Sequence, residues 1–281
     1  MTTPRILIIA GSDSGGGAGI QADIKTVTML GGHAMTAITA ITAQNTLGVQ
    51  AVMPVPAEMV LAQIESVVSD IGVDVVKIGM IGDAATARAV AERLDPERPG
   101  HASAPSMQVV FDPVMVATSG AVLADEETIA AFELLMKRAT LVTPNLPELE
   151  ALTGRKIDDA EQMKEAAMDL ASRLGTLVLA KGGHLLSGVI QDILVTPFRS
   201  GACAADTWSD PWIETRHSHG TGCTLASAIA TLLGRGLRIG EAVTVARRYV
   251  REAMLAAPGF GAGHGPMGHG LGVAPFEVIR P

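Results

Sequence analysis

The sequence predicts an α/β fold in which a mostly parallel central sheet carries helices on both faces. Short apolar runs alternate with stretches of helical periodicity along most of the 281 residues, the order that builds parallel sheets. Glycine and polar residues follow these runs, as expected where strands end. Hydrophobic residues make up 48% of the chain, enough for a core that needs no disulfide or metal. We expect a single domain over residues 1–281, with a glycine-rich tail from about Gly259 lying as a surface loop.

Six apolar runs are expected to form the strands of this sheet. Arg5–Gly11 opens it as a buried strand. His33–Thr42 alternates apolar residues with threonine, which is typical of a strand with two unlike faces. The other β-rich runs are Val73–Gly79, Met107–Val114, Ala139–Asn145 and Thr176–Gly183.

Helical patterns follow most of these strands. They cover Ala18–Leu30, Asp83–Leu94, Glu126–Lys137, Pro147–Leu152 and Ala160–Leu174. Between Gly188 and His219 strands follow one another without helices, which favours an antiparallel edge. Two further helices are expected at Thr221–Arg235 and Gly240–Ala256. We interpret Asp95–Ser106 as a loop within the domain.

Charge and composition exclude several kinds of partner. The formal net charge of −8, without a basic cluster, argues against a nucleic-acid binder. The apolar stretches are broken well before the ~18 residues of a membrane span, and the N-terminus lacks a signal-peptide core. Cys203 and Cys223 make neither a disulfide framework nor a zinc site. We therefore expect a cytoplasmic protein.

Two glycine-rich segments are candidates for ligand contacts. Gly11–Gly19 holds five glycines in nine residues, between a strand and a helix, so its backbone can approach a ligand closely; a mobile surface loop is the alternative. Gly220 and Gly222 precede an apolar helix whose free N–H groups and dipole suit a phosphoryl group. The same dipole is expected to lower the thiol pKa of Cys223. The plainer alternative is an N-cap turn with a small buried cysteine.

Polar residues at other strand ends suggest a cation and a metal. Asn145 and Glu148 are three residues apart, which suits Mg²⁺ with its oxygen ligands. The same spacing fits a helix capping box, which the spacing alone favours. Asp112 and Lys181 also follow strands, and each fits a surface residue as well. A lysine at the end of an apolar strand suggests a phosphate-binding cation.

In this order, the motifs resemble those of the hydroxymethylpyrimidine/phosphomethylpyrimidine kinases of thiamine biosynthesis, within the ribokinase-like superfamily. The blocks that carry the resemblance span residues 5–266 and are Ile9–Thr26, Thr42–Thr46, Lys77–Met80, Asp112–Met115, Thr143–Glu148, Lys181–His184 and Gly220–Thr224. The resemblance implies a three-layer αβα sandwich that forms a homodimer. It also implies two successive phosphorylations of 4-amino-5-hydroxymethyl-2-methylpyrimidine, with ATP and Mg²⁺.

The resemblance also assigns roles to individual residues. Those expected around the pyrimidine are Gln44, which would hydrogen-bond the ring, and Gly11, Asp23 and Met80. Those expected to form the anion hole are Gly220, Thr221 and Gly222. Those expected at the nucleotide and its metal are Lys181, Asn145 and Thr143, with Asp112 and Glu148 for Mg²⁺. Cys223 stands where most sugar kinases of the superfamily carry an aspartate base, so we hypothesise that it assists deprotonation of the substrate hydroxyl.

Two other functions compete with this one. A pyridoxal kinase of vitamin B6 salvage would use the same superfamily fold, although Gln44 and Met80 favour the pyrimidine. A non-catalytic ligand-binding protein would be expected to have lost Lys181, Asn145 or Gly222, and all three are present.

Overall fold

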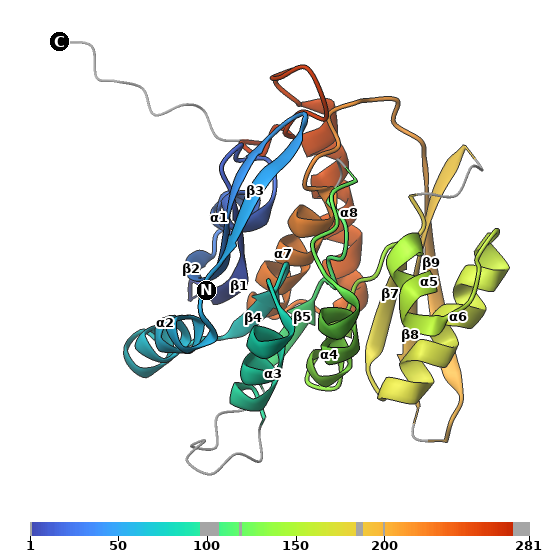
Figure 1. Cartoon of the computed structure of the whole chain (residues 1–281). Coiled ribbons are helices and arrows are strands. Elements are labelled where there is room, and N and C mark those ends of the chain that lie inside the picture. Colours follow the sequence, from blue (N-terminus) through green and yellow to red (C-terminus); the bar gives the residue numbers. More distant parts are fainter. Residues whose placement is uncertain (1, 96–106, 118–119, 184–187, 199, 272–281) are drawn as a thin grey trace.

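One nine-stranded sheet runs through the protein, between two layers of helices (Figure 1). The computed structural model describes residues 2–95, 107–117, 120–183, 188–198 and 200–271. The strand order is β3-β2-β1-β4-β5-β6-β7-β8-β9. The strands are β1 Arg5–Asp13, β2 His33–Asn45, β3 Gly48–Pro54, β4 Val75–Ile78, β5 Gln108–Phe111, β6 Leu141–Val142, β7 Leu177–Lys181, β8 Val189–Pro197 and β9 Cys203–Pro211.

The six predicted strands form the parallel centre of the sheet. Neighbours from β2 through β1, β4, β5, β6 and β7 all pair in parallel. β8 and β9 add to β7 in antiparallel register, so the antiparallel edge predicted between Gly188 and His219 is confirmed. Because the carboxyl ends of the parallel strands lie at one edge, the residues that follow them come together there.

Helices cover both faces of the sheet. Those on one face are α2 Ala57–Asp70, α3 Ala84–Arg93, α4 Glu126–Met136, α5 Leu146–Thr153 and α6 Ala160–Leu174. Those on the other are α1 Gly19–Met29, α7 Thr221–Gly234 and α8 Ile239–Leu255. In β1, Leu7 and Ile9 join the first core and Ile6 and Ile8 the second, which explains its unbroken apolar run. The three-layer αβα sandwich is thus confirmed.

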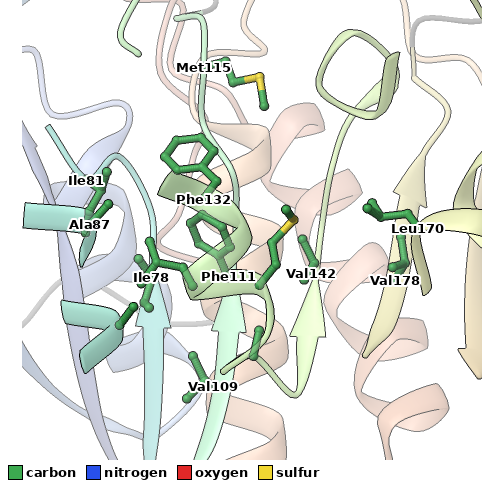
Figure 2. Packing of buried hydrophobic residues seen from close by; sticks show 14 of the residues in the cluster. Ile78, Ile81, Ala87, Val109, Phe111, Met115, Phe132, Val142, Leu170 and Val178 are labelled. Carbon is green, nitrogen blue, oxygen red and sulfur yellow. The ribbon is translucent and has the colours of Figure 1, made fainter. Parts of the chain in front are cut away.

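The first core is centred on an aromatic pair. Phe111 at the end of β5 meets Phe132 of α4 edge to face, with ring centroids 5.3 Å apart (Figure 2). Both side chains are fully buried, which is worth about 2–3 kcal/mol each in transfer free energy. This packing fixes β5 and therefore the position of Asp112, the next residue.

Two features differ from the sequence prediction. No element was predicted over residues 48–70, where β3 and α2 lie; β3 is an exposed edge strand, so its sequence carries no buried pattern. The tail is an exposed loop over residues 259–264, as predicted, but residues 265–269 turn inward. Met267 and His269 are buried, and Tyr249 Oη donates to the carbonyl of His269 at 2.8 Å. Most of the predicted loop at 95–106 lies outside the described residues.

Candidate active site

A cavity of about 800 Å³ opens at the carboxyl ends of the parallel strands, against the first turn of α7. Ligands bind at this edge in open α/β sheets. Eleven of the thirteen predicted site residues line it: Gly11, Gln44, Met80, Asp112, Asn145, Glu148, Lys181, Gly220, Thr221, Gly222 and Cys223. Asp23 and Thr143 are not among the lining residues. The predicted site is therefore one continuous space.

A buried cation, Lys181, lines the cavity. Lys181, the last residue of β7, places its Nζ 2.7 Å from Asp112 Oδ1 and 4.0 Å from Glu148 Oε2. Burial alone would lower the pKa of Lys181, but the two carboxylates outweigh it and raise that pKa above the usual value. Lys181 therefore stays protonated. Thr143 reaches the site only indirectly, because its hydroxyl donates to Asp112 Oδ1 at 2.9 Å.

Asn145 and Glu148 form the capping box that their spacing suggested. Asn145 Oδ1 accepts from the Glu148 backbone N–H at 2.9 Å, and Glu148 Oε2 accepts from the Asn145 N–H at 2.7 Å. Both residues also line the cavity. Burial raises the pKa of Glu148 to about 7, with Asp112 adding to the rise and Lys181 opposing it. The helix cap and the predicted metal site therefore involve the same two side chains.

The carboxylates of Asp112 and Glu148 fit Mg²⁺ by their chemistry. Both supply hard oxygen donors beside the same cation. Burial is the main cause of the raised pKa of Glu148, and the negative charge of Asp112 adds to it, so a divalent ion between the two carboxylates would favour their ionised forms. Within the described ranges, no group of three or more His, Cys, Asp or Glu side chains could hold a metal by itself. Such a pair suits an ion that takes its other ligands from phosphates and water, as Mg²⁺ does.

The first turn of α7 is built from glycine for steric reasons. Gly220 has φ +83°, and a Cβ there would lie 2.0 Å from the carbonyl oxygen of Gly17. The two glycine segments therefore pack directly on each other. A Cβ on Gly222 would lie 3.2 Å from Lys181 Nζ. The N–H groups of this turn thus lie next to the cation, an arrangement that binds anions.

The thiol of Cys223 does not behave as the sequence suggested. Burial raises its pKa to about 11, against the lowering effect of Lys77 nearby. The expectation that the helix dipole lowers this pKa was wrong, because desolvation of the thiolate dominates. At neutral pH Cys223 is a neutral thiol.

Asp13 and His219 also line the cavity, next to Gln44, and the sequence did not indicate them as a pair. Asp13 Oδ2 accepts from the N–H groups of Gly17 and Ala18 at 3.0 and 2.8 Å, which fixes the first glycine loop. His219 Nε2 lies 3.0 Å from the same oxygen and 3.0 Å from the side-chain amide of Gln44. Residues 206 positions apart carry no local signal of this pairing.

Asp23, predicted in the pocket wall, is not among the residues that line the cavity. It is fully buried, with its oxygens 2.8 and 3.0 Å from Lys77 Nζ. Ser227 of α7 donates to Asp23 Oδ1 at 2.7 Å. These contacts tie α1, β4 and α7 together.

A second ion pair lines the cavity and was also missed from the sequence. Arg247 of α8 donates to Asp192 of β8 at 2.8 Å, and both are buried. Asp192 also accepts from the N–H of Gly182 at 3.1 Å. This pair joins α8 to the sheet next to Lys181. The two residues lie 55 positions apart in separate elements, so no local sequence pattern indicates their pairing.

Among the described residues, no helix is long and apolar enough to cross a bilayer.

Comparison with known proteins assigns the family. Residues 13–268 match the family described as phosphomethylpyrimidine kinase. The chain is 42% identical to the hydroxymethylpyrimidine/phosphomethylpyrimidine kinase of Bacillus subtilis, over 96% of both chains. It is 50% identical to the thiamine biosynthesis bifunctional protein ThiED of Geobacter sulfurreducens, covering 94% of this chain but only about half, 52%, of that protein.

Solved structures agree on the fold. The phosphomethylpyrimidine kinase of Clostridium difficile superposes with a TM-score of 0.74 at 38% identity, covering 90% of this chain and 99% of that one. The Staphylococcus aureus pyridoxal kinase in complex with ADP superposes at 0.83 with 32% identity, covering 96% and 94%. These comparisons show that the chain belongs to the phosphomethylpyrimidine kinase family.

Proposed function

We propose that this protein is a single-domain kinase that phosphorylates 4-amino-5-hydroxymethyl-2-methylpyrimidine with ATP, first to the monophosphate and then to the diphosphate. One observation carries the proposal. The glycine-built first turn of α7, Lys181 and Gln44 all line one cavity. A ring held at Gln44 can direct its hydroxymethyl group toward the anion site.

Charge stabilisation is the main task of the first turn of α7 and Lys181. During phosphoryl transfer, negative charge spreads over three equatorial oxygens, and positioning and electrostatics supply most of the catalysis. The N–H groups of Gly220, Thr221 and Gly222 would bind these oxygens, with the Lys181 ammonium beside them. Because both are fixed by packing, little reorganisation accompanies the transfer.

We propose that Asp112 and Glu148 hold Mg²⁺ when MgATP binds. The ion would neutralise phosphate charge and orient the nucleotide. Thr143 donates to Asp112, and the backbone N–H of Asn145 donates to Glu148, so both carboxylates are held in place from the protein side.

Cys223 lies in the same turn, where the substrate hydroxyl would approach. Its thiol is neutral at neutral pH because its pKa is about 11. We therefore assign it a contact with the hydroxyl during transfer, with less weight as a base than the sequence suggested. A loose transition state needs little help from a base.

A product assay tests this function against pyridoxal phosphorylation. Pyridoxal is included because solved pyridoxal kinases superpose well on the chain. Purified protein with MgATP and either substrate is analysed by mass spectrometry. We expect successive mono- and diphosphates of the pyrimidine. Dominant pyridoxal phosphate would move the function to vitamin B6 salvage, and no product from either would support a binding protein without catalysis.

We also propose a cytoplasmic homodimer that pairs through the β2–β3 hairpin. Four large apolar side chains of this hairpin are exposed: Ile41, Leu47, Val52 and Met53. Ile41 and Met53 are cross-strand partners in the hairpin, and exposed apolar side chains that lie together mark interfaces. Sedimentation velocity should give twice the chain mass, and Met53→Glu should shift it to the monomer. A wild-type monomer at micromolar concentration would refute the pairing.

A further inference from the structure

The hydrogen-bond partners of Gln44 select one orientation of its carboxamide. As placed, Gln44 Nε2 lies 3.0 Å from His219 Nε2, and Gln44 Oε1 lies 3.3 Å from Thr42 Oγ1. The two ends of a carboxamide have nearly the same shape, so their assignment rests on their hydrogen-bond partners. A turn of 180° exchanges the two atoms and keeps both contacts.

The Nε2 atom of His219 can act only as a hydrogen-bond donor. The same Nε2 lies 3.0 Å from Asp13 Oδ2. Burial favours the neutral carboxyl of Asp13, but the hydrogen bonds from His219, Ala18 and Gly15 outweigh it and keep the pKa of Asp13 below its usual value. An ionised carboxylate accepts only, so the proton must sit on His219 Nε2, whether the ring is neutral or cationic. The Gln44 atom that faces it must then be an acceptor.

Thr42 leads to the same orientation independently. Its single hydroxyl proton is donated to the carbonyl oxygen of Ser12 at 2.8 Å. Thr42 Oγ1 therefore meets Gln44 as an acceptor and requires a donor there. With Oε1 toward His219 and Nε2 toward Thr42, the Thr42 contact becomes a hydrogen bond, and the Nε2–H of His219 is shared between two acceptors, Asp13 Oδ2 and Gln44 Oε1. The opposite orientation sets a donor against a donor and an acceptor against an acceptor.

We propose that His219, held by Asp13, is a positioning residue that fixes the Gln44 carboxamide with Oε1 on the His219 side and Nε2 on the Thr42 side, and thereby sets which ring edge the cavity accepts. The proposal rests on the proposed function and names the substrate chemistry of its ring-binding end. One lone pair of Oε1 and one N–H of Nε2 remain for a ligand.

The fixed amide selects a ring with a donor next to an acceptor. An exocyclic amino group would bind Oε1 on the His219 side, and the adjacent ring nitrogen would accept from Nε2 on the Thr42 side. The 4-oxo counterpart, with its carbonyl and protonated ring nitrogen, offers the opposite order. Buried polar groups left unpaired are rejected strongly, so we expect at least about 100-fold preference in kcat/KM for the amino ring.

The first test reads the proton directly and needs no substrate. Long-range ¹H–¹⁵N spectra of the labelled full-length protein report which ring nitrogen of His219 carries hydrogen. We expect the proton on Nε2 at neutral pH, and its loss in a spectrum of the His219→Leu variant assigns the signal. A neutral ring protonated only on Nδ1 would overturn the proposal, whatever the protein phosphorylates.

The second test measures ring selectivity. We compare kcat/KM for the 4-amino and 4-oxo pyrimidines in wild type, His219→Leu, Gln44→Leu and the double variant. His219→Leu should reduce the preference to about tenfold or less, mainly through KM, because the amide can now turn. In the Gln44→Leu background the same change should alter the preference less than twofold.

The control is His217→Leu, which changes a histidine of the same segment and should leave the preference unchanged. Equal losses for both rings in His219→Leu, or the same loss of preference in the Gln44→Leu background, would overturn the positioning role. If wild type phosphorylates neither pyrimidine, the proposed function fails, and the NMR measurement still decides the orientation of Gln44.

Discussion

Two parts of the cavity wall are built by different physical means. The part that we call the phosphoryl end relies on charge: Lys181 Nζ lies 2.7 Å from Asp112 and 4.0 Å from Glu148, next to the N-terminus of α7. The part that we call the ring end relies on the order of hydrogen-bond donors and acceptors from Asp13 through His219 to Gln44. Charge acts on any phosphoryl group alike, whereas an ordered donor and acceptor act on one ring edge.

This difference separates rate from selectivity. Changes at the phosphoryl end should lower turnover by the same factor for every ring that binds. Changes at the ring end should alter the ratio between substrates. The predictions below test that separation, beginning with the largest effect.

Removing the cation should have the largest effect. Lys181→Met should lower kcat about 10³-fold, because one preorganised charge at a phosphoryl group is worth about that much. The loss should be equal within threefold for the pyrimidine and for any pyridoxal activity. Steady-state kinetics with both rings measures it, and Lys156→Met, on a side chain 82% exposed, is the matched control. A loss confined to one ring would break the separation.

Loss of the buried Asp23–Lys77 ion pair should lower stability and leave the selectivity between ring substrates unchanged. Asp23→Asn leaves the Lys77 ammonium fully buried without its counter-charge and should lower the free energy of unfolding by about 3 kcal/mol. Asp158→Asn, which breaks an exposed pair with Lys156, should cost less than about 0.5 kcal/mol.

Urea unfolding measures both losses in free energy. The double variant Asp23→Leu, Lys77→Met should recover much of the loss, since no unpaired charge remains. A changed ratio between ring substrates in the Asp23 variant would instead return Asp23 to the pocket wall.

The sequence predicted the strands that carry an apolar or alternating pattern and missed β3, which carries neither. β1 is an unbroken apolar run because helices cover both of its sides. β3 has five exposed residues of seven, so nothing in its sequence marks it as part of a sheet. Glycine content correctly marked the tail as irregular, but could not show that Met267 and His269 turn inward.

The site divides in the same way. Asn145 and Glu148 are neighbours on one turn, so their spacing revealed both the cap and a metal reading. Asp13 and His219 meet only through the fold, and Asp23 resembled a pocket residue by motif, whereas its carboxylate pairs with the buried Lys77. Local geometry is readable from spacing, whereas pairing across the sheet requires the structure. The prediction of a lowered pKa for Cys223 was wrong for a related reason, because the burial of this thiol depends on residues from other elements.

Cys223 should matter less than Lys181. Cys223→Ala should lower kcat about tenfold and leave pyrimidine binding, measured by calorimetry, nearly unchanged. The effect is modest because a thiol with a pKa of about 11 is mostly protonated at neutral pH and transfer needs little base. Cys223→Ser, which keeps a hydroxyl in place of the thiol, is the matched variant. Equal turnover in Cys223→Ala would remove the residue from the mechanism.

The smallest predicted effect concerns Mg²⁺ and pH. The pKa of Glu148 is about 7, so at pH 6 this carboxyl is mostly protonated and at pH 8 mostly ionised. A protonated carboxyl binds a cation poorly, so the apparent affinity for Mg²⁺ in the kinase reaction should rise about fivefold from pH 6 to pH 8. Glu148→Gln keeps the capping-box acceptor and should lose this rise.

Protonation of the nucleotide affects wild type and Glu148→Gln equally. The difference between their Mg²⁺ titrations therefore isolates the contribution of Glu148. The folded state binds a proton on Glu148 that the unfolded chain releases between about pH 4.5 and 7, so this carboxyl lowers stability as pH rises through that window. Glu148→Gln should therefore be more stable than wild type at pH 8 and similar at pH 5. Parallel Mg²⁺ profiles in the two proteins would show that Glu148 serves the cap alone and leave Asp112 to bind the metal.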